Sequence, residues 1–211
     1  MNKILIADDH PLFLEGLKSA LQNRLHNTFI DHANSYLTLF SKIQNDDGEL
    51  DVVIMDLNMP GAANVSGLYF LRQTYQEIPI LVLSAHDSQE TRAECLLAGA
   101  SEFISKSIYI DELVSVLHDI FNGDYQFPNT NSLSTLPESL SKHFQQLSNL
   151  TPSQFKVLHL IANGDTNKSI AISLNISEKT VKNHISAIFT KLGVSNRTQA
   201  SNLFLKHKTT I

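Results

Sequence analysis

The chain has 211 residues, enough for one or two domains with a sizeable core. Its composition is that of a globular protein with 42% hydrophobic residues, and no apolar run approaches the length of a membrane span, which predicts a cytoplasmic protein without membrane contact. The single cysteine, Cys95, excludes an internal disulfide and fits a reducing compartment.

Charge is divided unevenly along the chain, although its total is only -5. Residues 1–123 contain 7 Lys and Arg against 17 Asp and Glu, whereas residues 150–211 contain 8 against 2. An acidic half joined to a basic half suggests that only the second meets nucleic acid. Residues 124–149 are rich in Asn, Ser and Thr and include Pro128 and Pro137, which predicts a linker between two domains.

In the first domain, apolar runs of strand length alternate with segments of helical periodicity. The predicted strands are residues 3–7, 29–33, 51–56, 79–84 and 102–105, and the predicted helices are residues 11–25, 35–43, 66–76, 88–98 and 109–121. Because each parallel crossover needs a helix, this order predicts an α/β fold with a five-stranded parallel, doubly wound sheet.

Polar side chains stand where four of these strands end. Asp8 and Asp9 follow the first strand, Asp56 ends the third, Ser84 ends the fourth and Lys106 follows the fifth. A single Asp in such a place most simply starts a loop. The carboxyl ends of parallel strands meet at one edge, however, so three carboxylates, a hydroxyl and an ammonium group are predicted to gather where α/β proteins bind ligands.

The second domain is predicted to be small and all-α. Thr151, Pro152 and Gln154 form a helix start, because Thr151 and Gln154 suit a capping box and Pro152 suits the first helical position. Four helices are predicted, with Asn175 at a left-handed cap and Gly193 ending the third helix, and the first is expected to turn three apolar side chains inward. The helices span residues 151–162, 168–174, 177–191 and 195–206, and the inward side chains are Phe155, Leu158 and Ile161. Short helices with tight turns indicate a helix-turn-helix domain.

The third of these helices has two opposite faces. Its apolar face consists of Val181, Ile185, Ile188, Phe189 and Leu192. Its polar face consists of Lys179, Lys182, Asn183, Ser186 and Thr190. A polar face is usually only solvated, but this one holds no acid, and amide and ammonium groups pair with purine edges. We therefore expect it to read bases in a DNA major groove.

Residues 1–123 resemble the receiver domain of two-component response regulators. The resemblance rests on the pair Asp8-Asp9, the motif of residues 56–60 (Asp-Leu-Asn-Met-Pro), Ser84-Ala85, Gly99-Ala100 and Lys106, in that order. It implies that a sensor histidine kinase or a small phosphodonor phosphorylates Asp56.

The receiver resemblance also implies roles for the neighbouring residues. Mg²⁺ (or Mn²⁺) would be held by Asp9, Asp56 and the main-chain carbonyl of Asn58, with Asp8 reaching it through water. Lys106 would hold phosphoryl oxygens, and Ser84 and Phe103 would form a switch pair that responds to phosphorylation. Ser107 departs from the many receivers that carry a cis Pro after the lysine.

Residues 150–206 resemble the LuxR-type helix-turn-helix domain that ends NarL/FixJ-type regulators. The match is dense in residues 167–171, 176–185 and 191–197, while Gln154 and Lys156 stand where the family often has acids. The resemblance implies binding to double-stranded DNA as a homodimer, with the last helix, which carries Phe204, in the dimer contact. The expected DNA contacts are Lys179, Thr180, Lys182, Asn183, Ser186, Lys191 and Arg197, of which Lys179, Lys191 and Arg197 face phosphates.

These observations predict a transcriptional response regulator that is no enzyme beyond self-phosphorylation from small donors and autodephosphorylation. One alternative is a regulator that works without phosphorylation, although the complete set of acids and Lys106 disfavours it. Another is a haloacid-dehalogenase-like phosphatase with an aspartyl-phosphate intermediate. That family needs a second Asp two residues after the first, and this chain has Asn58 there.

Overall fold

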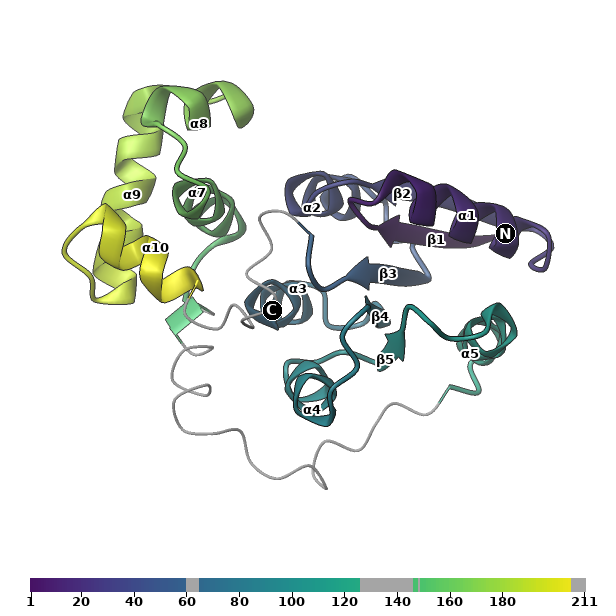
Figure 1. Ribbon diagram of the computed structural model, residues 1–211. Coiled ribbons are helices and arrows are strands. Elements are labelled where there is room, and N and C mark those ends of the chain that lie inside the picture. The colour runs from purple at the N-terminus through teal and green to yellow at the C-terminus, as the bar shows by residue number, and fades with distance from the viewer. Residues whose placement is uncertain (60–64, 126–145, 148, 206–211) are drawn as a thin grey trace.

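The computed structural model describes residues 1–59, 65–125, 146–147 and 149–205 (Figure 1). Pro60, most of the predicted linker with Pro128 and Pro137, and the end of the last predicted helix therefore lie outside the described residues. In the described ranges, no helix combines the length and the apolar character needed to cross a bilayer.

The first domain contains one five-stranded sheet in the order β2-β1-β3-β4-β5, and every pair of neighbouring strands is parallel. The strands are β1 (Asn2–Ala7), β2 (Thr28–Ala33), β3 (Val52–Asp56), β4 (Ile80–Ser84) and β5 (Glu102–Ser105). The helices between and after them are α1 (Pro11–Gln22), α2 (Tyr36–Gln44), α3 (Val65–Thr74), α4 (Gln89–Leu97) and α5 (Ile110–Asn122). The predicted fold class is confirmed, and the largest difference in bounds is α1, which ends before the predicted Leu25.

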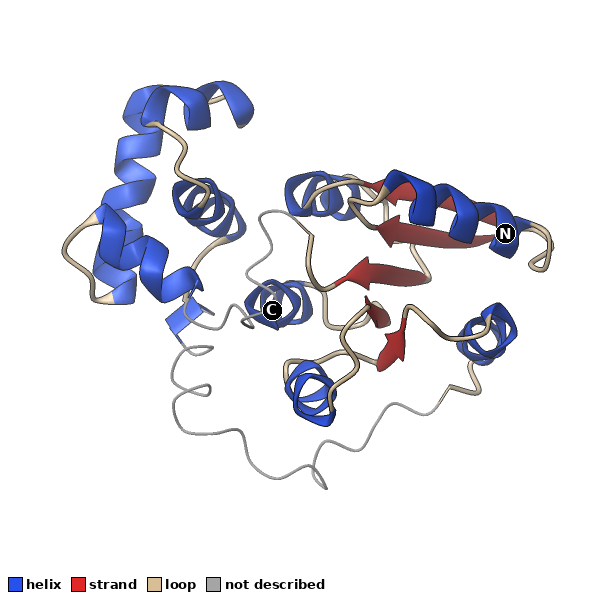
Figure 2. Cartoon of the chain, in the orientation of Figure 1, coloured by secondary structure: helices blue, strands red, loops and turns tan. Residues whose placement is uncertain are grey.

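Helices cover both faces of the sheet (Figure 2). Ile4 and Ile6 of β1 pack in one hydrophobic cluster with residues of α1 and α5, whereas Leu5 and Ala7 pack in the other with residues of α2, α3 and α4. Successive side chains of a strand point to opposite faces, so a strand covered on both sides must be apolar throughout. This explains the uninterrupted apolar runs in the sequence.

Helices α2 and α3 approach closely at Gly67. The side chain of Tyr36 is buried, and a Cβ atom built on Gly67 would lie 2.3 Å from the end of its ring. Gly67 has an ordinary helical backbone, so its lack of a side chain serves packing and not conformation.

The second domain contains α7 (Pro152–Ala162), α8 (Asn167–Ser173), α9 (Glu178–Leu192) and α10 (Arg197–Leu205). The predicted capping box is present, because the Gln154 amide donates to Thr151 Oγ1 and the Thr151 amide donates to Gln154 Oε1, at 3.3 and 3.0 Å. Asn175 has a φ angle of 53°, which confirms its predicted left-handed cap, and Gly193 ends α9 as predicted, with a φ angle of 69°.

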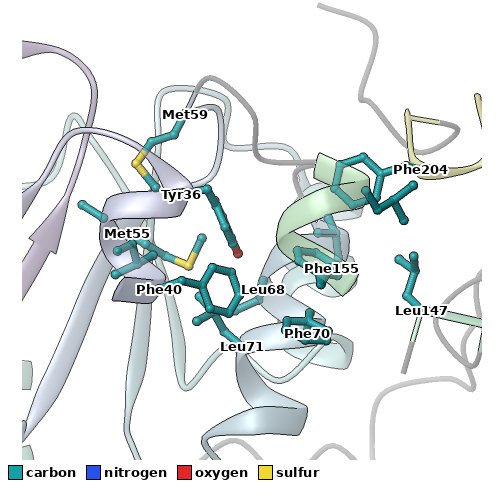
Figure 3. Packing of buried hydrophobic residues seen from close by; sticks show 14 of the residues in the cluster. Tyr36, Phe40, Met55, Met59, Leu68, Phe70, Leu71, Leu147, Phe155 and Phe204 are labelled. Carbon is teal, nitrogen blue, oxygen red and sulfur yellow. The ribbon is translucent and has the colours of Figure 1, made fainter. Parts of the chain in front are cut away.

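The two domains touch through aromatic side chains (Figure 3). The ring of Phe155 on α7 stacks on Phe70 of α3, with centroids 4.0 Å apart, and lies 5.8 Å from the ring of Phe40 on α2. Beside them, Lys156 Nζ donates to Gln44 Oε1 at 3.0 Å. Phe155 thus packs inside its own domain, as predicted, and also against the first domain, which the sequence analysis did not predict.

Candidate functional sites

The structure brings together the acidic and basic side chains predicted to meet at the strand ends. Lys106 Nζ lies 2.7 Å from Asp8 Oδ2 and 2.9 Å from Asp56 Oδ2. The side chains of Asp8 and Asp56 are 1% and 2% exposed, whereas that of Asp9 is 24% exposed. Asp56, at the end of β3, is therefore a buried carboxylate in contact with one cation.

Burial and the neighbouring opposite charge shift the pKa values of Asp56 and Lys106 in opposite directions. Burial raises the pKa of the Asp56 carboxyl above its ordinary value, and contact with Lys106 only partly offsets the rise. Burial alone would lower the pKa of Lys106, but its hydrogen bonds to Asp8 and Asp56 raise it overall. Lys106 is the one ammonium group bonded to these carboxylates among the described residues, so the cluster remains suited to a further cation.

The donor atoms present fit a divalent metal ion. Asp8, Asp9, His10 and Asp56 each offer one ligand atom, and these four atoms lie within 4.8 Å of one another. Asp9 Oδ1 is buried and accepts no hydrogen bond from the described residues. The Asn58 amide donates to Asp56 Oδ1 at 3.2 Å, which places the main chain of Asn58 beside the cluster. Carboxylate oxygens are the ligands that hard divalent ions prefer.

His10 belongs to this cluster, although it is not among the site residues predicted from the sequence. Its Nδ1 lies 3.1 Å from Asp8 Oδ1 and 3.3 Å from Asp9 Oδ1. The available signal was its position directly after the acidic pair, because the chain must turn there from β1 into α1. His10 occupies the residue before α1 with an extended backbone, φ -94° and ψ 101°.

The two predicted switch residues are both buried. The Ser84 hydroxyl donates to the main-chain carbonyl of His86 at 3.0 Å, so it is engaged by the loop after β4. Phe103 is 1% exposed within the hydrophobic cluster, and the guanidinium carbon of Arg92 lies 5.1 Å from its ring centroid. A role for Ser84 and Phe103 in switching stays a prediction.

The absence of proline after Lys106 does not misplace that lysine. The described residues contain no cis peptide bond, and the Ser107 hydroxyl shares a hydrogen bond of 2.8 Å with Ser105. Lys106 nevertheless reaches both Asp8 and Asp56.

Helix α9 carries the two faces predicted for it. Val181, Ile188 and Leu192 are at most 2% exposed in the core. All five predicted polar-face residues are exposed, and they are Lys179, Lys182, Asn183, Ser186 and Thr190. Thr180, at the helix start, is half-buried, and its amide donates to the Ser177 cap at 3.0 Å.

Two of the predicted phosphate-binding residues have partners inside the domain. Lys191 Nζ donates to Gln154 Oε1 at 2.8 Å, and Arg197 donates to the main-chain carbonyl of Asp165 and to Asn167 Oδ1. Gln154 Oε1 therefore accepts hydrogen bonds both from Lys191 Nζ and from the Thr151 amide of the capping box. The neutral Gln154 side chain takes the place of the acid that is frequent at this position. Phosphate contacts by Lys191 and Arg197 stay predictions.

Comparison with known protein families agrees with this architecture. Residues 4–118 match the model of the response regulator receiver domain. Residues 148–204 match the model of the luxR family of bacterial regulatory proteins.

Similar proteins match the chain over nearly its whole length. The glycerol metabolism activator of Pseudomonas putida is 36% identical over 208 residues, covering 95% of this chain and 93% of that protein. The nitrate/nitrite response regulator protein NarP of Escherichia coli is 30% identical over 207 residues, covering 98% and 95%. RcsB from Salmonella enterica serovar Typhimurium, solved bound to promoter rprA with the phosphomimetic BeF3⁻, is 25% identical with a TM-score of 0.53, covering 97% and 98%. The chain is thus a transcriptional response regulator with a receiver domain and a LuxR-type DNA-binding domain.

Proposed function

We propose that this regulator acts in the cytoplasm, that phosphorylation of Asp56 switches it, and that it is not an enzyme in its own right. The contact between the buried Asp56 carboxylate and Lys106 Nζ, 2.9 Å away, carries the proposal. An anionic carboxylate must approach an anionic phosphoryl group, and the fixed ammonium group offsets their repulsion.

The neighbouring residues fit this chemistry. In phosphoryl transfer, an Asp56 oxygen attacks phosphorus and the bond to the donor's leaving group breaks, while Lys106 stays close enough to hold a phosphoryl oxygen. Asp8, Asp9, Asp56 and the main chain of Asn58 would hold Mg²⁺ or Mn²⁺, which supplies positive charge for the phosphoryl oxygens. Asn58 offers no acid or base two residues after Asp56, so a phosphatase mechanism lacks its proton donor.

The assignment of Asp56 is tested by intact-mass measurement after incubation with acetyl phosphate and Mg²⁺. Wild type should gain one phosphoryl group, and Asp56→Asn should gain none. Asp111→Asn is a matched control, because Asp111 is a carboxylate with an 81% exposed side chain on α5, and it should be modified like wild type. An undiminished adduct on Asp56→Asn would place the phosphoacceptor elsewhere.

We further infer that phosphorylation changes the population of the docked arrangement in which Phe155 stacks on Phe70. Two observations support this route. Helix α3, which carries Phe70, is the first helix after the strand that ends in Asp56, and α7 begins the domain that carries the exposed polar face of α9. A ligand or modification shifts such an equilibrium only through differential contacts with the two states.

Light scattering and DNA titration, each with and without beryllofluoride and Mg²⁺, test this switch. Association into a homodimer, or affinity for double-stranded DNA, should increase on activation. Beryllofluoride takes the place of the phosphoryl group in these experiments, and in the cell we expect a sensor histidine kinase to donate that group. If neither association nor affinity changes while the mass experiment shows phosphorylation of Asp56, the regulator works independently of its phosphorylation.

A further inference from the structure

His10 points its imidazole at the acidic cluster without being forced there by burial. Its side chain is 64% exposed, and it makes no hydrogen bond that caps α1. Nevertheless Nδ1 lies 3.1 Å from Asp8 Oδ1, 3.3 Å from Asp9 Oδ1 and 3.8 Å from Asp56 Oδ2. One ring nitrogen therefore faces carboxylates from two different strand ends.

These spacings are those of atoms that share a metal ion. Neighbouring ligands on an octahedral ion with bonds of about 2.1 Å lie about 3 Å apart. Asp8 Oδ1 accepts the main-chain amide of His10 at 2.8 Å and is also within hydrogen-bond distance of Nδ1, but a bond to this one oxygen would not require Nδ1 to lie near Asp9 and Asp56 as well. Convergence of Nδ1 on Asp8, Asp9 and Asp56 is better explained by a shared ion than by a single hydrogen bond.

We propose that His10 is a nitrogen ligand of the metal ion at this site, and that it gives the site a preference for divalent transition ions such as Mn²⁺ over Mg²⁺. The inference rests on the proposed metal site, and it adds a ligand of a different class. Carboxylate and carbonyl oxygens suit Mg²⁺, whereas imidazole nitrogen strengthens the binding of transition ions much more than that of Mg²⁺.

Electron paramagnetic resonance of the full chain loaded with Mn²⁺ tests the proposal directly. Pulsed measurement of wild type should show modulation from a directly bound ¹⁴N nucleus, and His10→Ala and His10→Asn should lack it. Titration of Mn²⁺ with Mg²⁺ as competitor should show that the preference for Mn²⁺ falls about tenfold in both variants. Substitutions around a metal centre typically change metal affinity by about this factor or more. Thermal unfolding confirms that both variants are folded.

A third variant separates this inference from the metal site itself. Asp9→Asn should weaken Mn²⁺ binding whatever the role of His10. If Asp9→Asn weakens binding but wild type shows no ¹⁴N modulation, or His10→Ala keeps both the modulation and the preference for Mn²⁺, the site is an oxygen site and the inference is wrong. If Asp9→Asn leaves Mn²⁺ binding unchanged, the acidic metal site is wrong as well.

Discussion

Phe155 on α7 lies flat against Phe70 on α3, with ring planes 10° apart and ring centroids separated by 4.0 Å. Both rings are at most 2% exposed, and Phe155 also meets Phe204 of α10 edge to face, with centroids 5.4 Å apart. One side chain therefore completes the core of its own domain and covers the surface of the other. Contact between the domains is coupled to the packing of each.

The first prediction concerns this stacked pair. Phe70→Ala should loosen the contact between the domains, because it removes the ring on which Phe155 rests, and X-ray scattering should show a larger radius of gyration. The variant loses the stacking contribution of about 0.5–1.5 kcal/mol to the contact between the domains, whereas Phe155 stays in place to fill the core of its own domain. Tyr109→Ala is the control, since Tyr109 is 81% exposed. Unchanged scattering in Phe70→Ala contradicts the prediction.

The second prediction compares two helical glycines. Gly67→Ala should lower the free energy of unfolding by about 1–3 kcal/mol, because the new methyl group overlaps the ring of Tyr36. Gly16→Ala in α1 should raise it by about 0.5–1 kcal/mol, because nothing lies within 4 Å of the added Cβ and alanine favours the helix. Urea unfolding of both variants measures the difference, and effects of the same sign would contradict the packing described for α2 and α3.

The third prediction separates base reading from phosphate binding on α9. Asn183→Ala should reduce the difference in binding free energy between preferred and scrambled DNA by about 1–3 kcal/mol. Lys179→Ala should weaken both complexes alike, and it should lower the slope of log affinity against log salt concentration by about one, because one fewer phosphate is neutralised. Lys179 is a better control than Lys191, which Gln154 holds within the domain. If Lys179→Ala removes specificity and Asn183→Ala does not, another part of the helix reads the bases.

The fourth prediction concerns acid stability. Burial lowers the pKa of His159 to about 4, and neither ring nitrogen has a hydrogen-bond partner among the described residues. In the unfolded chain the His159 imidazole binds a proton near pH 6.5, whereas in the folded chain it stays neutral down to about pH 4. This group therefore leaves the free energy of unfolding undiminished above pH 6.5 and lowers it progressively as the pH falls toward 4. The loss amounts to about 3 kcal/mol over this range.

His159→Phe removes the titrating group but keeps an aromatic ring beside Phe204. Urea unfolding between pH 7 and pH 4.5 should therefore give a flatter stability profile for this variant than for wild type. His26→Asn, at an exposed histidine, should follow the wild-type profile. Parallel profiles for wild type and His159→Phe would show that His159 is not buried as a neutral ring.

Local sequence was sufficient to predict the helices and strands, because each carries its own signals. The capping box of Thr151 and Gln154 and the left-handed Asn175 depend on a few neighbouring residues and are confirmed. The cluster of Asp8, Asp56 and Lys106 was also predictable, since parallel topology alone places these strand ends together.

Features that depend on distant contacts were not predictable from local signals. The periodicity of α7 places Phe155 on an apolar face but does not reveal that Phe70 covers it. Arg197 lies near a helix start in a basic domain, where a phosphate contact is a reasonable expectation, and only the fold shows the Asp165 carbonyl beside it. His10 was missed for a different reason: its position directly after the acidic pair indicates that it lies near the cluster, but a histidine before a helix carries no signal for the direction of its ring.

The double packing of Phe155 limits how this regulator can exchange parts with its relatives. A chimera that joins this receiver domain to another regulator's C-terminal domain keeps the stack on Phe70 only if that domain carries a flat apolar side chain at the matching position. A polar side chain there would leave Phe40 and Phe70 uncovered. Recombination between such regulators is therefore constrained by a complementary surface as well as by the linker that connects the domains.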